Sequence, residues 1–156
     1  MNVRVGLGFD VHAFGGAGPL VLGGVVIPEG PGLEGHSDAD VVAHAVADAL
    51  LGAAGLPDLG TLFPASDPAH RDASSIGLLT DVVGRVHAAG WAVANVDVVV
   101  AAEVPRLGPH VPAMATLLTD AVSGPVSVKP KRTEGVGAVG RGEGIAAWAV
   151  ALLLVP

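Results

Sequence analysis

Cysteine is absent from this chain, and aromatic residues make up only 3% of it. The lack of cysteine excludes a disulfide framework and a thiolate metal site, and it is typical of a cytoplasmic protein. Because aromatic side chains are so few, the core has to be built from valine, leucine, isoleucine and alanine. The length of 156 residues suits one domain with a core of its own, so we predict a single domain over residues 1–156.

Basic residues are also few, with 8 lysines and arginines against 15 acidic residues and a net charge of −7. Proteins that bind nucleic acid usually present a basic face, so we expect no nucleic-acid partner. The longest uncharged apolar stretch, residues 145–155, is shorter than the roughly 20 residues that a membrane-spanning helix needs. Asp10 interrupts any apolar region that could form a signal peptide. We therefore expect no membrane partner and a cytoplasmic location.

Strand and helix patterns alternate along the chain. Strands are expected at residues 3–12, 20–27, 93–102, 126–128 and 145–154, with loops at 15–19, 28–35 and 56–68. Helices are expected from a cap at Ser37 to residue 54, from Ser74 to residue 90, and over a short segment that ends near residue 122. This order predicts a two-layer α/β (α+β) domain, in which a mixed sheet carries helices on one face. The other face would then be buried against copies of the chain in an oligomer.

The first predicted strand places two metal-ligating groups on one face. Residues 3 to 12 alternate between apolar side chains and polar residues or glycine, so Asp10 and His12 point the same way. One carboxylate and two imidazoles are a common ligand set for Zn²⁺ with an open fourth position, and His44 on the next helix is the candidate second imidazole. The alternative is that Asp10 pairs with a basic group and that His44 is an ordinary polar residue.

Two other groups have both a chemical and a structural interpretation. His36 and Ser37 precede a helix whose first turn can bind an anion, but Ser37 can equally be a simple cap. Asp58 could accept hydrogen bonds from a polyol, whereas Asp58, Ser66 and Asp67 are also common turn residues.

Five of the basic residues gather in the last third of the chain: Arg106, Lys129, Lys131, Arg132 and Arg141. Cations and a hydroxyl at residues 131–133 can hold a diphosphate, and Glu134 can hold a second dication that bridges phosphate oxygens. The alternative is a solvated strand end. The chain has no P-loop, no dinucleotide-binding glycine motif and no nucleophile elbow.

Taken together, six segments resemble the 2-C-methyl-D-erythritol 2,4-cyclodiphosphate synthase family over essentially the whole chain. They are residues 8–12, 35–44, 48–53, 62–64, 105–110 and 140–146. The resemblance implies a lyase of the non-mevalonate isoprenoid pathway. Its substrate is a cytidine diphosphate ester of methylerythritol that bears a 2-phosphate. The 2-phosphate attacks the β-phosphorus, CMP leaves, and a cyclic diphosphate forms. The resemblance also implies a homotrimer with active sites between subunits.

The resemblance assigns roles to residues of this chain. Asp10, His12 and His44 match the Zn²⁺ ligands, Glu134 matches the ligand of Mg²⁺ or Mn²⁺ on the diphosphate, and His36 and Ser37 match phosphate-side contacts. We expect His36 and Arg132 to be the catalytic residues. Substrate contacts are expected from Asp10, Val11, His12, His36, Ser37, Asp58, Leu59, Gly60, Phe63, Pro64, Ala65, Ser66, Asp67, Ala102, Pro105, Arg106, Leu107, Gly108, Lys131, Arg132, Thr133, Glu134, Ala138 and Arg141. Within this set, residues 63–67 match a substrate loop, and residues 102–108 match a cytosine pocket.

Two departures from the family pattern stand out. Lys131 and Arg132 precede Thr133, where the family usually has a run of threonines, and Ala138 stands where the family usually has phenylalanine. Position 138 belongs, in relatives, to a pocket along the trimer axis. Two other functions remain open from the residues alone. One is a metal-dependent phosphohydrolase that uses water as its nucleophile, and the other is a non-catalytic trimer that binds isoprenoid diphosphates.

Overall fold

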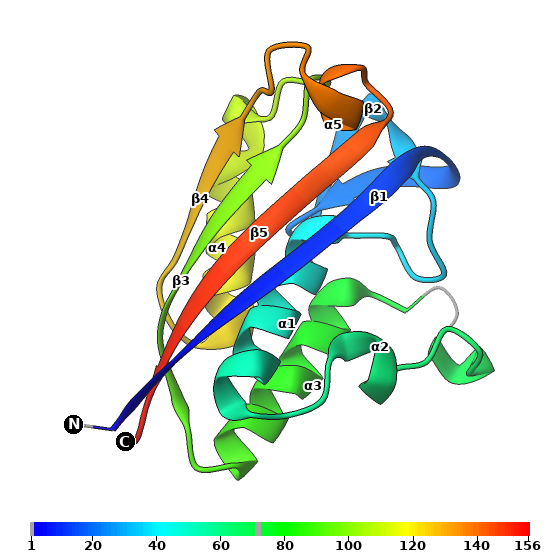
Figure 1. The fold of residues 1–156 in the computed structure, drawn as a ribbon. Coiled ribbons are helices and arrows are strands. Elements are labelled where there is room, and N and C mark those ends of the chain that lie inside the picture. Colours follow the sequence, from blue (N-terminus) through cyan, green and yellow to red (C-terminus); the bar gives the residue numbers. More distant parts are fainter. Residues whose placement is uncertain (1, 71–72) are drawn as a thin grey trace.

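A computed structural model describes residues 2–70 and 73–156 of the chain. Its strands are β1 (Val3–Leu22), β2 (Val25–Leu33), β3 (Ala92–Ala101), β4 (Val126–Lys131) and β5 (Gly144–Leu154). They form one sheet in the order β2-β1-β5-β3-β4 (Figure 1). β3 and β4 run parallel, whereas β1–β2, β1–β5 and β3–β5 are antiparallel. The predicted mixed sheet is therefore confirmed.

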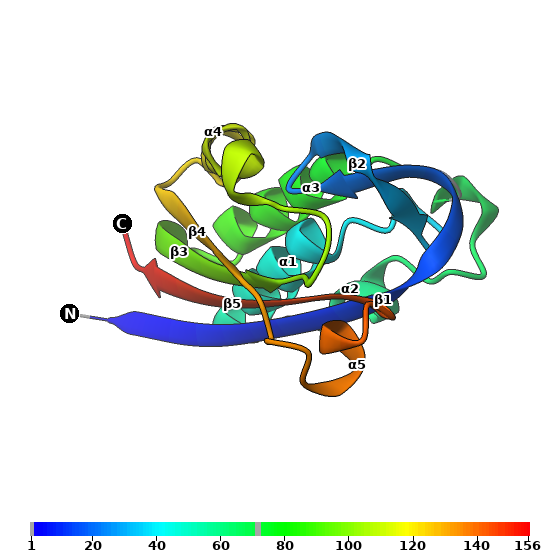
Figure 2. The same ribbon diagram turned by 90° about the horizontal axis from the view of Figure 1, so that it is seen from above.

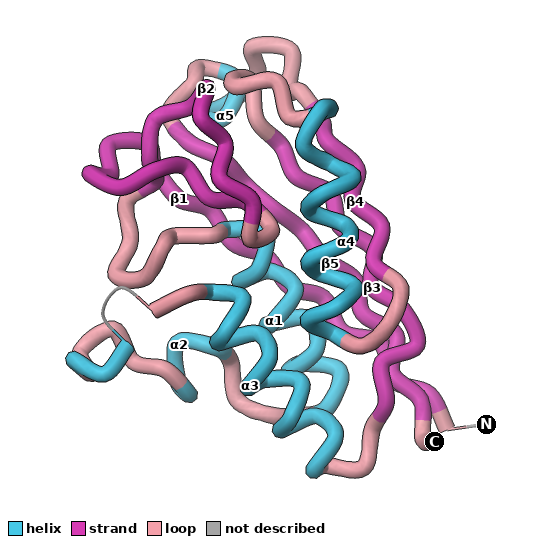
Figure 3. Tube along the Cα trace, turned by 180° about the vertical axis from the view of Figure 1, so that it is seen from behind, coloured by secondary structure: helices cyan, strands magenta, loops and turns pink. Residues whose placement is uncertain are grey.

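Three helices cover one face of this sheet. They are α1 (Val41–Ala54), α3 (Ser75–Ala88) and α4 (Val111–Val122), and all three lie on the same side in Figures 2 and 3. The short elements are α2 (Leu59–Leu62), α5 (Gly137–Gly140) and two 3₁₀ turns, η1 (Pro68–His70) and η2 (Gly108–His110). α5 lies against the opposite face of the sheet (Figure 2). The prediction that helices cover one face of the sheet therefore holds for the three long helices only. Within the described residues, no helix is both long and apolar enough to cross a membrane.

The contact between β1 and α1 depends on two glycines. A Cβ atom on Gly6 would lie 2.0 Å from the carbonyl oxygen of Ala49, and one on Gly8 would lie 1.9 Å from that of Ala45. No side chain fits in either place, so glycine allows the helix backbone to lie directly on the strand. Asp10 continues this face of β1, and its carboxylate meets α1 at His44, the residue that precedes Ala45.

The start of α1 differs from the sequence prediction. Ser37 is not the helix cap; the N-cap is Asp40, and the helix begins at Val41. The buried Asp40 carboxylate accepts hydrogen bonds from the backbone N–H groups of Val42 and Ala43 at 3.1 and 3.0 Å. It also accepts from Gly23 and Gly24 in the β1–β2 turn, at 2.8 and 2.7 Å. A carboxylate with four acceptor positions can serve both segments, and so it fixes the helix start against the hairpin.

The loops predicted at 15–19 and 28–35 are wrong over residues 15–19 and 28–33, because β1 continues to Leu22 and β2 runs from Val25 to Leu33. The pairing of β1 with β2 has register shifts between Phe14 and Leu20, and these irregularities allow the strand to contain the glycines and the proline that suggested a loop. The expected loop at 56–68 contains α2, and β4 extends to Lys131 rather than ending at residue 128. The predicted cap of α3 is confirmed, since the Ser74 side chain accepts from the N–H of Gly77.

Candidate functional site

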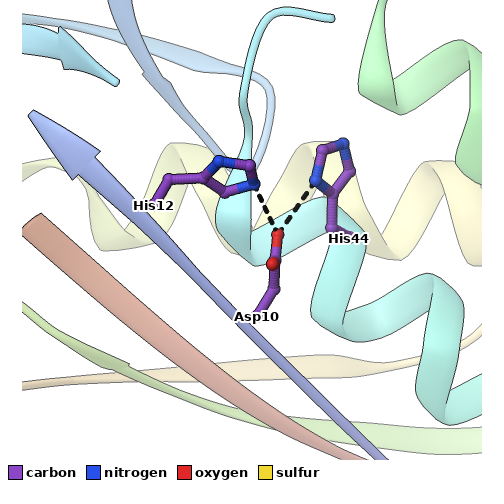
Figure 4. Close-up of side chains that lie close together, drawn as sticks. All are labelled: Asp10, His12 and His44. Carbon is purple, nitrogen blue, oxygen red and sulfur yellow. Dashed lines mark hydrogen bonds and ion pairs between the residues drawn. The ribbon is translucent and has the colours of Figure 1, made fainter. Parts of the chain in front are cut away.

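Three metal-ligating side chains converge where β1 meets the first turn of α1 (Figure 4). Asp10 Oδ2 lies 2.9 Å from His12 Nε2 and 3.0 Å from His44 Nδ1. One potential ligand atom from each residue lies within 4.8 Å of the others. The sequence prediction that these three residues share one site is confirmed.

The protonation of His12 follows from its neighbours. Its Nδ1 lies 2.6 Å from the carbonyl oxygen of Glu34, and a carbonyl only accepts, so Nδ1 carries a proton. Nε2 therefore faces the Asp10 carboxylate with a lone pair, unless it binds a second proton or a metal. The hydrogen bond that a protonated Nε2 donates to the Asp10 carboxylate raises the pKa of His12, despite partial burial. Burial opposes ionisation of Asp10, but hydrogen bonds and charge from the two imidazoles hold the pKa of Asp10 well below its usual value.

The donor set fits a divalent metal ion. One carboxylate and two imidazoles are held within ligand distance, and the Glu34 carbonyl orients one imidazole from behind. Zn²⁺ is commonly bound by such a set with a fourth position left for substrate or water. The second imidazole, that of His44, also has hydrogen-bond partners on the side of its ring that faces away from Asp10. His44 Nε2 lies 2.9 Å from Ser75 Oγ and 3.4 Å from Ser37 Oγ.

These three residues form part of the wall of a cavity of about 310 Å³. The lining residues are Asp10, His12, Gly35, His36, Ser37, His44, Asp48, Leu59, Gly60, Phe63, Ala65, His70 and Leu78. We call this hollow the metal-side cavity. It brings together residues from β1, the 35–37 loop, α1 and the segment after it.

Asp48 is a lining residue that the sequence assignment missed. It follows His44 by one helical turn, and that spacing was the available signal. Its Oδ1 accepts a hydrogen bond from the N–H of Leu59 at 2.8 Å, which joins α1 to α2. Burial raises the pKa of Asp48. A half-buried carboxyl group therefore stands in the cavity wall beside the metal-ligating set.

The segment from residue 58 to residue 70 forms the rim of the metal-side cavity. Asp58 caps α2 by accepting from the N–H and the hydroxyl of Thr61 at 2.9 and 3.1 Å, and these hydrogen bonds lower its pKa. The Phe63 ring meets His70 edge-on at 5.2 Å, and the Arg85 guanidinium lies 5.5 Å from the same ring. Leu59, Gly60, Phe63 and Ala65 line the cavity. Val11, Asp58, Pro64, Ser66 and Asp67 are not among its lining residues.

A second cavity, of about 570 Å³, lies between the loop after β3 and the end of β4. Its lining residues are Ala102, Glu103, Val104, Pro105, Arg106, Leu107, Gly108, Pro130, Lys131 and Arg132. We call it the nucleotide-side cavity, after the cytosine pocket that the sequence resemblance implies for residues 102–108. The sequence assignment named seven of these residues individually and covered Glu103 and Val104 only within the segment 102–108; it missed Pro130. Residues 102–108 and the cations at 131–132, far apart in sequence, thus share one hollow.

Glu103 organises the charges in the nucleotide-side cavity. Its carboxylate accepts from Arg132 Nη2 at 2.7 Å and from the N–H of Thr133 at 3.2 Å. The hydrogen bond from Arg132 lowers the pKa of Glu103. The Arg132 side chain is 66% exposed, so much of its guanidinium stays open to solvent. The buried Thr133 Oγ1 has no hydrogen-bond partner within the described part of the chain.

The remaining assigned residues lie outside both sets of lining residues. Glu134 is exposed and has a φ of 54°, a left-handed conformation that non-glycine residues seldom adopt and that is frequent at functional sites. Ala138 lies in α5, and Arg141 pairs with Glu143 at 2.6 Å. The two cavities have no lining residue in common. Within one chain, the metal-ligating set and the nucleotide-side cavity are therefore separate hollows.

Comparisons with known proteins agree with this geometry. The YgbB family matches residues 3–154. A 2-C-methyl-D-erythritol 2,4-cyclodiphosphate synthase from Bordetella petrii is 57% identical over 158 residues, which cover 98% of this chain and 98% of that protein. The synthase of the same name from Escherichia coli is 52% identical, over 97% of this chain and 98% of the relative.

Among solved structures, the CDP complex of IspF from Plasmodium falciparum superimposes with a TM-score of 0.84 at 30% identity, over 98% of this chain and 96% of that one. Sequence and fold thus agree along nearly the whole length. The chain belongs to the YgbB family.

Proposed function

We propose that this protein is the lyase that forms 2-C-methyl-D-erythritol 2,4-cyclodiphosphate and CMP in isoprenoid biosynthesis. The substrate is 4-diphosphocytidyl-2-C-methyl-D-erythritol 2-phosphate. Full-length curated relatives at 57% and 52% identity carry this synthase name. The observation that carries the proposal is the convergence of Asp10, His12 and His44 in the wall of the metal-side cavity.

The reaction joins two groups of one molecule. An oxygen of the 2-phosphate forms a bond to the β-phosphorus, the bond from that phosphorus to the α-phosphate oxygen breaks, and CMP leaves with the electron pair. Such a ring closure needs positioning and charge neutralisation rather than a protein nucleophile. A divalent ion bound by Asp10, His12 and His44 would neutralise phosphate charge at the reacting end.

We assign the metal-side cavity to the methylerythritol part of the substrate. Its wall offers His36 and Ser37 as hydrogen-bonding groups for phosphate, with His36 as a catalytic group, and Gly60 in the α2 segment for the polyol. Asp58 and Leu59 belong to the same segment, although the Asp58 carboxylate already caps α2. Residues 63–67 would close over this end, beside the Phe63–His70 contact.

We assign the nucleotide-side cavity to the cytidine diphosphate. The backbone groups of residues 102–108 can read the base edge, and the cationic side chains of Lys131 and Arg132, which line the same cavity, can bind the phosphates. A CDP complex of a structural neighbour supports a nucleotide ligand for this fold. Thr133 offers an unpartnered hydroxyl, and Glu134 offers an exposed carboxylate for Mg²⁺ or Mn²⁺ on the diphosphate.

We further propose a homotrimer in which the nucleotide-side cavity of one copy faces the metal-side cavity of the next. The sheet face away from the long helices exposes a row of apolar side chains on β1 and β5. They include Val5, Leu7, Phe9, Trp148 and Val150. Phe9 and Trp148 stack at 5.2 Å between ring centroids. An exposed apolar surface of this kind indicates a protein interface. Three copies of the face would bury it.

The decisive experiment is ³¹P NMR of the purified protein with the cytidine diphosphate substrate, Zn²⁺ and Mg²⁺. Ring closure gives signals of CMP and of a cyclic diphosphate. A phosphohydrolase would instead give CMP and an open-chain methylerythritol that carries two separate phosphate monoesters. A trimer that only binds isoprenoid diphosphates, near Phe9, Ala138 and Arg141, would leave the substrate unchanged. Either of the last two results would overturn the proposal. We keep the cytoplasm as the expected compartment, since the chain has no cysteine.

A further inference from the structure

His44 has a partner on the side of its ring that faces away from Asp10. Its Nε2 lies 2.9 Å from Ser75 Oγ. Ser75 is the first residue of α3, and it is only 1% exposed. Ser37 Oγ lies farther from the same nitrogen, at 3.4 Å, and it also accepts from the N–H of Ala39 at 3.3 Å. Ser75 is therefore the nearer and more buried partner of the imidazole.

Asp38 fixes the direction of the Ser75 hydroxyl. Its Oδ2 accepts from the backbone N–H of Ser75 at 3.0 Å, and its Oδ1 accepts from the Ser75 hydroxyl in a short hydrogen bond. The N–H of Asp38 in turn donates to the carbonyl oxygen of Ala73 at 3.4 Å. An ionised carboxylate only accepts, and a serine hydroxyl has a single proton. That proton is thus directed to Asp38.

The same count of protons determines the state of His44. With its proton on Asp38, Ser75 Oγ has only lone pairs to offer to His44, so Nε2 must be the nitrogen that carries hydrogen. The lone pair of the neutral ring then lies on Nδ1, which is the atom 3.0 Å from Asp10. His12 shows the same arrangement with a backbone acceptor, because the Glu34 carbonyl takes its Nδ1–H and leaves Nε2 toward Asp10.

We propose that Ser75, backed by Asp38, is a positioning residue that holds His44 in the tautomer and ring orientation required for metal binding. This inference rests on the metal site proposed above and adds two residues behind it. Partners of this kind typically change metal affinity about 10- to 100-fold when they are removed. The competing interpretation is that Ser75 and Asp38 only dock the 35–40 loop onto the start of α3.

The first test compares two adjacent serines. Ser75→Ala removes the hydroxyl behind His44, whereas Ser74→Ala removes the α3 cap, which accepts from the N–H of Gly77 and has no hydrogen bond to His44. We expect Ser75→Ala to weaken Zn²⁺ binding about ten-fold or more in competition with a chromophoric chelator. We expect Ser74→Ala to bind Zn²⁺ like the wild type, even though it loses helix stability. Equal affinities for the wild type and Ser75→Ala would overturn the inference.

The second test reads the tautomer directly, and its first measurement uses the wild type alone. In ¹H–¹⁵N spectra of the zinc-loaded wild type, we expect a protected Nε2–H signal for His44, and in Ser75→Ala we expect this proton to exchange faster with water. A purely structural role would not change that signal. A His44 that carries its proton on Nδ1 would refute the inference even if zinc binds. If the wild type bound no zinc in the chelator assay, the proposed metal site would itself be wrong, and this inference would fall with it.

Discussion

Gly8→Ala tests whether the contact between β1 and α1 sets the metal site. The new Cβ would lie 1.9 Å from the carbonyl oxygen of Ala45, whereas ordinary van der Waals contact begins at 3.4 Å. The strand and the helix would therefore have to separate locally by about 1.5 Å, the difference between these two distances. Overpacking of a core contact typically costs about 1–3 kcal/mol, and backbone atoms give way less easily than side chains. We expect a loss at the upper end of that range.

The same displacement would separate two metal ligands, because Asp10 follows Gly8 on β1 and His44 precedes Ala45 on α1. Metal–ligand distances tolerate deviations of only about 0.2 Å, so a shift several times larger should remove most of the zinc affinity. We would measure the free energy of unfolding with urea at fixed protein concentration, and zinc affinity by chelator competition.

A matched control for Gly8→Ala is Gly84→Ala on α3. A Cβ at Gly84 meets no atom within 4 Å, and we expect this change to stabilise the helix by about 0.5–1 kcal/mol without altering zinc binding. Wild-type stability and zinc affinity in Gly8→Ala would refute the reasoning. So would a loss of both properties in the control, because that would show that any added methyl group is harmful.

Three further predictions concern charge and assembly. The pKa of His12 is raised in the metal-free protein, so its pair with Asp10 stabilises the fold fully below about pH 6.5 and loses this contribution as the pH rises through the raised pKa. The urea midpoint of the chelator-treated wild type, compared with that of His12→Gln, should therefore decrease as the pH is raised from about 6 to about 8. The stabilisation that added zinc provides should increase over the same range, because the metal ligands must be deprotonated to bind zinc. The Leu7 side chain is 67% exposed on the apolar sheet face, and Leu7→Lys should give monomers in light scattering. The control, Val26→Lys on β2, should leave the trimer intact. A trimeric Leu7→Lys variant would contradict the proposed interface. Arg132→Thr should lower turnover about ten-fold at low Mg²⁺, and high Mg²⁺ should partly restore turnover in this variant. Glu103→Gln frees the Arg132 guanidinium and should make turnover less dependent on Mg²⁺. An unchanged Mg²⁺ dependence in both variants would exclude a phosphate contact for Arg132.

The metal-ligating set could be predicted from the sequence because it depends on local periodicity. Asp10 and His12 share a strand face by alternation, and that periodicity survives folding. The start of α1 could not be predicted in the same way. Asp40 takes the cap position because the turn at Gly23 and Gly24 supplies two further donors, and that turn is brought to the helix only by the fold. Ser37 has the right residue type for a cap but lacks this second set of contacts.

The nucleotide-side cavity was predicted in part, for a similar reason. Its cations were visible as a cluster in the last third of the chain, but Glu103 belongs to the loop after β3 and meets Arg132 only through the parallel pairing of β3 and β4. The position of α5 on the far face of the sheet, and the extension of β1 and β2 through glycine and proline, likewise depend on tertiary packing and on irregular register. Neither tertiary packing nor irregular register can be predicted from the local propensities of the residues.

Strand β1 uses its two faces for separate purposes. Gly6, Gly8 and Asp10 face the helix, while Leu7 and Phe9 project from the other side, where we place the neighbouring copies. Side chains alternate with a period of two, so inserting a single residue between Gly8 and Asp10 would put the two glycines and the carboxylate on opposite faces. Either the carboxylate and imidazole would then enter the apolar surface, or the apolar side chains before the insertion would clash with the helix backbone. A point substitution on β1 therefore affects the contacts of one face only, whereas insertion of a single residue disrupts the contacts of both faces.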